Sequence, residues 1–281
     1  MKIMILAIGR SGTTALLHKV SSALPESQAF SGGKTDKVAG VSGNAVFKFT
    51  YNETRGRTFE MFNEHLRQTE YDRKIWIARD PRDNALSRFL FRWYRGSESA
   101  KDQYRAVIDL VEKKERNPES VPFHELMRYR GQNLEPFTTA TEVGEDERQT
   151  FSQMHDFVGG LGDDWFVFKY EDLIDNNFAK LNEYLGLEIK TETNIDKSTK
   201  KVARKKSTGD WRHWYTEEDV NLFRSAYTPY MNLIGYDSDD WTLHDKQVIE
   251  PEYASQYLKN LPQRRRLDTL QGFKKKISRF F

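Results

Sequence analysis

The sequence predicts a single α/β domain with a mainly parallel central sheet that is flanked by helices. Short apolar runs recur along the chain, and longer stretches with helical character separate them. This alternation is typical of βαβ units, in which the carboxyl ends of the strands meet at one edge of the sheet. A length of 281 residues is enough for one large domain, which we expect to span residues 1–261, followed by a distinct tail over 262–281.

Strands are predicted at 2–8, 44–50, 73–78 and 164–170, and helices at 55–69, 84–95 and 100–116, with an earlier helix that begins near Ala15. Residues 117–150 are polar and rich in proline without clean periodicity, which predicts a short helix and a loop. A Lys/Thr-rich loop is expected over 188–210. The last helix is predicted from Thr216, which would cap it ahead of three acidic residues.

A glycine-bearing loop follows the first predicted strand. Gly9-Arg10-Ser11-Gly12-Thr13-Thr14 comes directly after the apolar run of residues 3–8. A strand, loop and helix in this order direct backbone N–H groups and the positive end of the helix dipole toward one point. The glycines allow an anion to approach closely, the hydroxyl groups are donors, and Arg10 adds positive charge. The sequence therefore predicts an anion site at this loop.

A second anion site is predicted around Arg79-Asp80-Pro81-Arg82-Asp83. Arg79 stands at the end of the predicted strand 73–78, and Ser87 lies eight residues further on, in the first turns of a helix that Asp83 or Asn84 would cap. Both anion sites lie at the same edge of a parallel sheet. Such a pair of sites suits a ligand that carries phosphate groups at both ends.

With these two elements the sequence resembles the sulfotransferases that use 3′-phosphoadenosine 5′-phosphosulfate (PAPS). Residues 9–14 are similar to the family's 5′-phosphosulfate loop, and residues 79–87 to its 3′-phosphate motif. Val167-Phe168-Lys169-Tyr170-Glu171-Asp172-Leu173 resembles the strand whose tyrosine stacks near the adenine. Arg204-Lys205-Lys206-Ser207-Thr208-Gly209-Asp210-Trp211-Arg212 is similar to the family's R-K-G-x-x-G-D-W-K segment. The resemblance implies the P-loop NTPase-like sulfotransferase fold.

The resemblance also implies the reaction, which is transfer of a sulfuryl group from PAPS, as cosubstrate, to a hydroxyl acceptor without a metal. The acceptor class that we expect includes glycans and glycolipids. Lys48 stands at a strand end where the family often has a lysine, so Arg10 and Lys48 are expected to stabilise the departing 5′-phosphate. The residues that the resemblance assigns to the donor are Arg10, Ser11, Gly12, Thr13, Thr14, Arg79, Ser87, Tyr170, Arg204, Lys205 and Lys206.

The catalytic base departs from the family pattern. Many soluble members carry K-x-H after the lysine strand, whereas this chain has Lys48-Phe49-Thr50, and threonine is no base near neutral pH. Other branches use a glutamate after the first helix, and here that segment offers Asp36. Glu53 is the second carboxylate within reach, so the sequence leaves Asp36 and Glu53 as the two candidates.

Two other classes of function remain open at this stage. An ATP-using P-loop kinase shares the strand, loop and helix, but the lysine of G-x-x-x-x-G-K-[ST] is absent after Gly12. A non-catalytic protein that binds a membrane surface or an anionic polymer would use the basic tail. That class leaves Arg79, Ser87 and the segment Arg204–Trp211 unexplained.

Composition narrows the setting of the protein. A net charge of +2 gives no sign of nucleic-acid binding, and the lack of cysteine excludes disulfides and thiolate chemistry. The sequence contains no run of eighteen apolar residues, so no membrane span is predicted. The first apolar run is too short for a secretory signal, and we therefore expect a cytoplasmic protein.

The tail is electrostatically separate from the rest of the chain. Residues 262–281 carry seven basic residues and one acidic residue, which leaves residues 1–261 with a net charge of −4. Its Leu and Phe residues share one face in a helical projection. This pattern predicts either peripheral contact with a membrane through residues 264–281 or packing on the protein itself.

Overall fold

The computed structural model describes residues 1–31, 40–52, 57–131, 134–190 and 208–263. Backbone contacts divide the chain into two units. Unit 1 comprises Met1–Asp80, Gln153–Ile195 and Leu233–Tyr236, and unit 2 comprises Pro81–Ser152, Asp196–Asn232 and Asp237–Phe281. The first boundary therefore falls inside the predicted 3′-phosphate motif, between Asp80 and Pro81.

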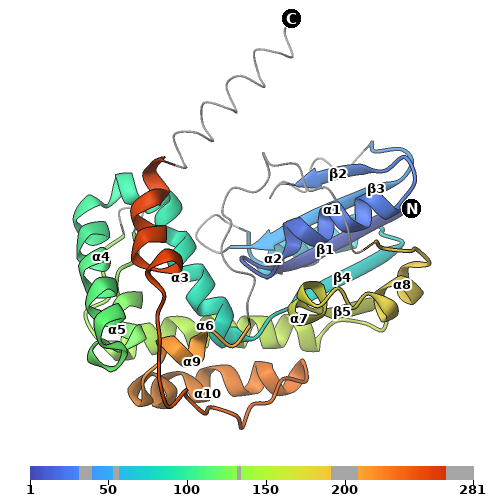
Figure 1. The fold of residues 1–281 in the computed structure, drawn as a ribbon. Coiled ribbons are helices and arrows are strands. Elements are labelled where there is room, and N and C mark those ends of the chain that lie inside the picture. The colour runs from blue at the N-terminus through green and yellow to red at the C-terminus, as the bar shows by residue number, and fades with distance from the viewer. Residues whose placement is uncertain (32–39, 53–56, 132–133, 191–207, 264–281) are drawn as a thin grey trace, which may run out of the picture. The chain divides into compact units, whose positions relative to one another are not determined.

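Unit 1 contains a five-stranded sheet in the order β2-β3-β1-β4-β5, and every adjacent pair is parallel (Figure 1). This arrangement confirms the predicted α/β fold with its parallel sheet. One strand, β2, was not predicted, because its four residues are exposed or half-buried and form no apolar run. The strands are β1 (Lys2–Ile8), β2 (Gln28–Ser31), β3 (Ala45–Tyr51), β4 (Arg73–Ala78) and β5 (Trp165–Lys169).

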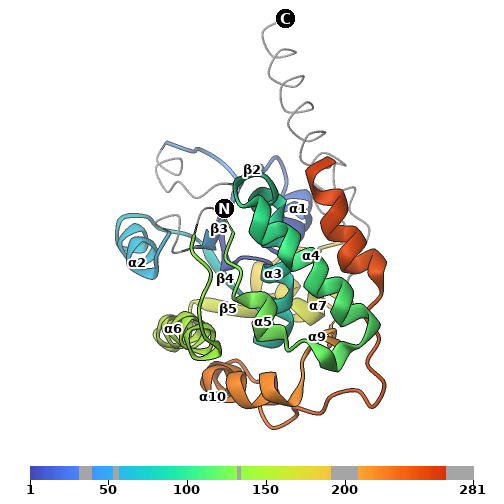
Figure 2. The same ribbon diagram turned by 90° about the vertical axis from the view of Figure 1, so that its left-hand side faces the viewer.

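Both faces of this sheet are buried, which explains why the central strands are apolar throughout. On one face, α1 (Thr13–Ala23) and α8 (Ala179–Leu185) pack on aliphatic side chains of β1 and β4. On the other face, α2 (Phe59–Gln68) contributes Phe59 and Phe62 to an aromatic cluster with the strands. Figure 2 shows α1 and α2 on opposite sides of the strands. Along β3, for example, Val46 faces the aliphatic core, whereas Phe49 and Tyr51 face the aromatic cluster.

Unit 2 is helical. The helices α3 (Pro81–Ser99) and α4 (Lys101–Arg116) pack against each other, and α5 (Phe123–Met127) lies beside α4. Two longer helices, α6 (Ala140–Gly159) and α10 (Glu217–Leu233), begin in unit 2 and end in residues assigned to unit 1. The shorter elements are η3 (Pro118–Ser120), α9 (Trp211–Trp214), η5 (Pro251–Tyr253) and a helical stretch over 255–263.

Three predicted boundaries were wrong. The helix predicted over 84–95 begins at Pro81, because proline suits the first position of a helix, so Asp83 and Asn84 lie inside the first turn and do not cap it. The helix predicted over 55–69 begins only at Phe59, where Thr58 accepts a hydrogen bond from the Met61 amide and caps it. The loop predicted up to residue 150 ends at α6, which starts at Ala140.

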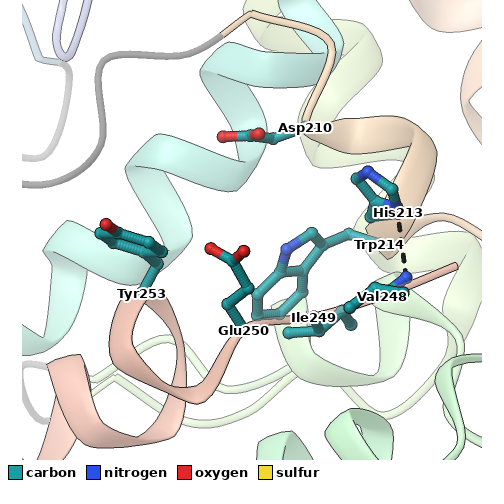
Figure 3. A pocket seen from close by; sticks show the side chains of 7 residues that line it. All are labelled: Asp210, His213, Trp214, Val248, Ile249, Glu250 and Tyr253. Carbon is teal, nitrogen blue, oxygen red and sulfur yellow. Dashed lines mark hydrogen bonds between the residues drawn. The ribbon is translucent and has the colours of Figure 1, made fainter.

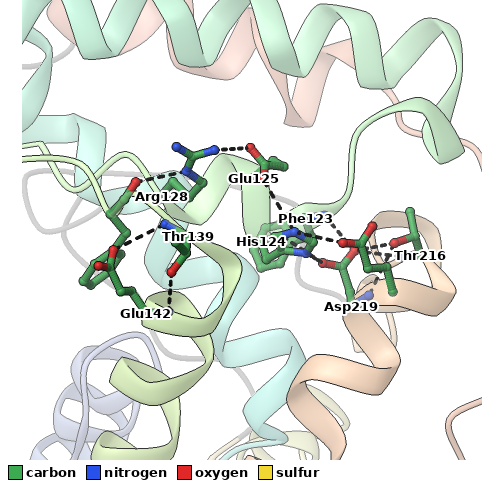
Figure 4. Close-up of polar contacts among 10 residues, drawn as sticks. Phe123, His124, Glu125, Arg128, Thr139, Glu142, Thr216 and Asp219 are labelled. Carbon is green, nitrogen blue, oxygen red and sulfur yellow. Dashed lines mark hydrogen bonds and ion pairs between the residues drawn. The ribbon is translucent and has the colours of Figure 1, made fainter.

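The start of α10 confirms the predicted cap and adds a buried histidine to it. Thr216 and Asp219 exchange side-chain-to-backbone hydrogen bonds of 3.4 and 2.8 Å, which form a reciprocal capping box. The Asp219 carboxylate also accepts hydrogen bonds from the backbone N–H groups of Phe123 and His124, at 2.7 and 2.8 Å, and it contacts the His124 ring (Figure 4). One fully buried carboxylate therefore joins α5 to α10.

Candidate functional site

The predicted phosphate loop of unit 1 runs from the end of β1 into α1. Gly12 occupies the N-cap position of α1 with a left-handed backbone, at φ 79°, and provides no side-chain cap. The first turn of α1 contains no acidic residue. Because the first N–H groups of a helix carry partial positive charge, this end of α1 is suited to bind an anion.

The loop backbone is strained at Arg10 and is held there by Arg79. Arg10 has φ 75°, a conformation that costs a residue other than glycine of the order of 1 kcal/mol. Nη1 of Arg79 donates a hydrogen bond of 2.7 Å to the Arg10 carbonyl. Arg79 therefore fixes the peptide group that follows Arg10 and ties the end of β4 to the loop after β1.

The guanidinium of Arg79 also packs on Tyr170, the first residue of α7 (Tyr170–Ile174). Its central carbon lies 4.1 Å from the centroid of the tyrosine ring. Arg79 is only 9% exposed, and its Nε has no hydrogen-bond partner among the described residues. A buried donor of this kind is suited to an anionic ligand, since buried polar groups are almost always paired.

Gly12 makes the closest approach in the loop. A Cβ atom at this position would lie 2.7 Å from a methyl carbon of Leu173 and 3.0 Å from the Tyr170 ring. Both the positive φ and this contact require glycine. The loop therefore packs closely against α7, which brings Gly12, Arg79 and Tyr170 close together.

Lys48 faces the same loop from β3. Its Nζ donates a hydrogen bond of 2.8 Å to the Thr14 hydroxyl on the first turn of α1. Alternation along β3 puts Lys48 on the face that α1 covers, two residues after the buried Val46. The ammonium group is thus located at the positive end of α1, where it adds charge for an anion.

Two hydroxyl residues of the loop are less accessible than the motif suggests. Ser11 is fully buried and Thr13 is 6% exposed, whereas Arg10, Gly12 and Thr14 are half-buried. Ser11 and Thr13 therefore contribute to this site through their backbone N–H groups more readily than through an exposed side chain.

Glu171 is a carboxylate of unit 1 whose charge interacts with that of Arg79. Burial raises the pKa of Glu171, and a hydrogen bond from the Tyr236 hydroxyl opposes that rise. The charges of Asp80 and Arg79 act on the same carboxyl group in opposite directions. Glu171 follows Tyr170 directly in the chain, and its charge interaction with Arg79 favours its ionised form.

In unit 2, the other half of the predicted 3′-phosphate motif forms the first two turns of α3. Ser87 is 5% exposed on this helix. One turn earlier, the Asp83 carboxylate accepts hydrogen bonds from the backbone N–H groups of Gly209 and Trp211, at 2.6 and 3.1 Å. Unit 2 therefore brings the start of α3 together with the G-D-W turn that the sequence predicts for the same ligand.

Some predicted site residues lie outside the described residues. They are the two candidate bases, Asp36 and Glu53, the three basic residues Arg204, Lys205 and Lys206, and the tail segment 264–281. Their assignments stay predictions.

A pocket in unit 2 lies next to the G-D-W turn and was not predicted (Figure 3). Its polar groups include the carboxylates of Asp210 and Glu250, and the His213 ring accepts a hydrogen bond from the Val248 amide at 3.2 Å. Two carboxylates beside aromatic rings would disfavour a phosphate. The lining residues are Asp210, His213, Trp214, Val248, Ile249, Glu250 and Tyr253.

Among the residues that the structure describes, no group of three or more His, Cys, Asp or Glu side chains has an arrangement that would hold a metal ion. No helix in the described ranges has both the length and the apolarity needed to cross a membrane.

A parallel α/β sheet with a glycine-bearing loop between its first strand and first helix is an arrangement that many α/β proteins use to bind phosphate groups. Residues 1–235 match the sulfotransferase domain family, so the chain belongs to that family and is a transferase of the sulfotransferase class with its α/β fold. Among solved structures, the chain is similar to a sulfotransferase from Alicyclobacillus acidocaldarius, with 16% sequence identity and a TM-score of 0.43. That similarity covers 84% of this chain and 96% of the other. No curated protein matches the chain at a significant level.

Proposed function

We propose that this sulfotransferase uses PAPS as its donor and a hydroxyl group as its acceptor. The observation that carries the proposal is in unit 1, where the uncapped N-terminus of α1 lies beside the cationic side chain of Lys48. An anion bound there would receive backbone N–H groups and positive charge together. The 5′-phosphosulfate of PAPS is an anion of this kind.

In the proposed reaction the main task of the protein is to stabilise the leaving group, because the protein forms no covalent bond with the substrate. The bond between sulfur and the 5′-phosphate oxygen breaks, a new sulfur–oxygen bond forms to the acceptor, and negative charge collects on the 5′-phosphate. Groups that oppose this charge lower the barrier, as in phosphoryl transfer. We assign this role to Arg10, Lys48 and the N–H groups of the loop.

The 3′-phosphate is the feature that separates PAPS from other adenine nucleotides. We assign its binding to Arg79 and Ser87, with Arg204, Lys205 and the backbone of Lys206, and the adenine to the neighbourhood of Tyr170. The orphaned Nε of Arg79 supports the assignment of an anion to this side chain.

The acceptor hydroxyl must lose its proton as the new bond forms. We propose that Asp36 or Glu53 accepts this proton, since Thr50 replaces the usual histidine. A general base contributes about 10²–10⁴-fold to the rate, so removing the true base lowers turnover by that factor while nucleotide affinity is retained. Asp36→Asn and Glu53→Gln, each measured for both quantities, identify the base. Near-normal turnover in both variants would exclude both residues.

Calorimetry with adenosine 3′,5′-bisphosphate, the product of PAPS, tests the donor assignment. We expect binding that is unaffected by EDTA and tighter than that of ATP with Mg²⁺. A preference for ATP with Mg²⁺ would instead favour a P-loop kinase, and the absence of any nucleotide binding would favour a non-catalytic protein. A panel of glycan and glycolipid acceptors then tests the class of acceptor that we propose.

A further inference from the structure

Two residues of the 3′-phosphate motif have no assigned role in binding, yet both contact the G-D-W turn. The Asp83 carboxylate is 3% exposed and uses separate oxygens for the two turn amides, Oδ2 for Gly209 and Oδ1 for Trp211. These contacts join residues that are 126 and 128 positions apart in the sequence. A carboxylate this deeply buried is costly unless it is hydrogen-bonded, so the turn and the start of α3 stabilise each other.

Arg82 contacts the indole ring of Trp211 in the same turn. Its guanidinium carbon lies 4.3 Å from the ring centroid of Trp211 and 5.0 Å from that of Trp241, so the cation contacts both rings. Arg82 also donates a hydrogen bond to the Asp240 carbonyl. Trp211 is only 1% exposed. Arg82 and Asp83 therefore anchor one turn by its indole ring and by its backbone.

Gly209 adopts a backbone conformation that glycine reaches at low cost, and the hydrogen bonds to Asp83 help to fix it. Gly209 has φ +79° and no atom within 4 Å of where its Cβ would stand, so local packing does not restrict it. The two hydrogen bonds to Asp83 supply that restriction. Without them, the turn gains conformational freedom that a ligand would have to remove on binding.

We propose that Asp83 is a positioning residue for recognition of the 3′-phosphate. Ser87 lies one helical turn beyond Asp83 on the same face of α3, and the turn held by Asp83 belongs to the same R-K-K-S-T-G-D-W stretch of sequence that the proposed function assigns to this phosphate. Asp83 thus links the two segments of unit 2 that the proposed function assigns to this phosphate, and the inference rests on that function.

The test compares two ligands and three variants. Calorimetry gives the dissociation constants of adenosine 3′,5′-bisphosphate and adenosine 5′-phosphate for the wild type, Asp83→Asn, Asp83→Ala and Glu115→Gln. Their ratio measures discrimination by the 3′-phosphate. Asp83→Asn keeps the size of the side chain but loses its charge, and we expect it to reduce this ratio about tenfold. Asp83→Ala is expected to reduce the ratio at least as much.

Glu115→Gln is the matched control. The Glu115 carboxylate also joins distant segments of unit 2, through hydrogen bonds of 2.7 and 2.9 Å from the backbone N–H and hydroxyl of Ser255. We expect this variant to keep the wild-type ratio. Hydrogen exchange provides a second readout, because the amides of Gly209 and Trp211 should exchange faster in the Asp83 variants alone.

The outcomes separate the inference from the function on which it rests. A wild type that does not prefer the bisphosphate contradicts the proposed donor, whatever the variants do. If the wild type prefers it, and Asp83→Asn keeps that preference while the two amides exchange faster, Asp83 serves stability only and the positioning role is wrong. A loss of preference in Glu115→Gln equal to that in Asp83→Asn would overturn it as well.

Discussion

The guanidinium carbon of Arg79 lies 4.1 Å from the ring centroid of Tyr170, although 90 residues of sequence stand between them. The register of the sheet explains this contact. Ala78, the last residue of β4, pairs with Lys169, the last residue of β5. Arg79 and Tyr170 are therefore the first residues after two adjacent parallel strands. Both side chains therefore emerge together at the carboxyl edge of the sheet, beside the loop after β1.

Substitution of Tyr170 tests whether the contact between its ring and Arg79 contributes to nucleotide binding. Tyr170→Ala removes the ring, and we expect it to weaken binding of adenosine 3′,5′-bisphosphate about threefold to tenfold, since a cation–π contact contributes about 0.5–2 kcal/mol. Tyr170→Phe keeps the ring and should bind nearly as the wild type does. Calorimetry measures both. Equal losses in the two variants would show that the hydroxyl group matters and the stack does not.

Arg79 itself should act through the 3′-phosphate. Charge-assisted hydrogen bonds to a phosphate contribute about 1.5–3 kcal/mol each, so Arg79→Ala should weaken binding of adenosine 3′,5′-bisphosphate at least about tenfold. The loss should be much smaller for adenosine 5′-phosphate, and calorimetry with both ligands measures the difference. An equal loss for both ligands would limit Arg79 to its contacts with Arg10 and Tyr170.

Replacement of Gly12 should reduce stability through two separate effects. Gly12→Ala imposes a left-handed conformation on alanine and pushes Cβ against Leu173 and Tyr170. Gly43→Ala is the matched control, because Gly43 has φ +77° but no atom within 4 Å of the added Cβ. We expect urea unfolding to show a loss of about 1 kcal/mol for Gly43→Ala and about 1–3 kcal/mol more for Gly12→Ala. Equal losses would mean that α7 moves aside without cost.

Lys48 should affect the chemical step and leave binding of the product almost unchanged. Removing one group that stabilises developing charge typically costs about 10²–10³-fold in kcat, and we expect this loss for Lys48→Met. Hydrolysis of PAPS, which needs no acceptor, measures the step, and calorimetry measures the affinity for the bisphosphate.

Lys74→Met is the control for the Lys48 experiment. Lys74 is also a half-buried strand lysine of unit 1, but it pairs with Asp164 near the amino end of β4. Normal hydrolysis is expected for this variant. A similar slowing in both variants would trace the effect to stability of the sheet.

The His124–Asp219 contact predicts a pH dependence of stability. Burial disfavours the charged ring, but the hydrogen bond to Asp219 and the charges of Glu218 and Glu125 outweigh burial and raise the pKa of His124 above 6.5. The folded state therefore favours the protonated ring, and the resulting stabilisation is present below pH 6.5 and is lost as the pH rises through the raised pKa.

His124→Asn tests this dependence, because asparagine keeps a donor for Asp219 but does not titrate. We expect the wild type to exceed the variant in free energy of unfolding most at low pH, with the difference shrinking from pH 6.5 upward as the raised pKa is passed. Urea unfolding over that range measures it. A difference that does not change with pH would show that folding leaves the pKa of His124 unshifted, and a difference that grows as the pH rises would show that the folded state favours the neutral ring.

The sequence by itself determined the central strands, the phosphate loop and the capping box of α10, because each depends on nearby residues. Burial on both faces makes β1 and β4 apolar throughout, the glycines of the loop follow β1 directly, and Thr216 stands three residues before Asp219. The same locality explains the errors. The edge strand β2 has no apolar run, and α6 lacks a clean periodic pattern where it begins.

Only the tertiary structure decided how residues far apart in the chain contact one another. Arg79 meets Tyr170 because strand register brings them to adjacent positions, and Asp83 accepts the amides of Gly209 and Trp211 instead of capping α3. Neither partner can be derived from local spacing, because a buried arginine or aspartate takes whichever groups the packed chain brings within reach. The sequence therefore specified the residues to which we assign anion binding, whereas packing determined which residues contact them.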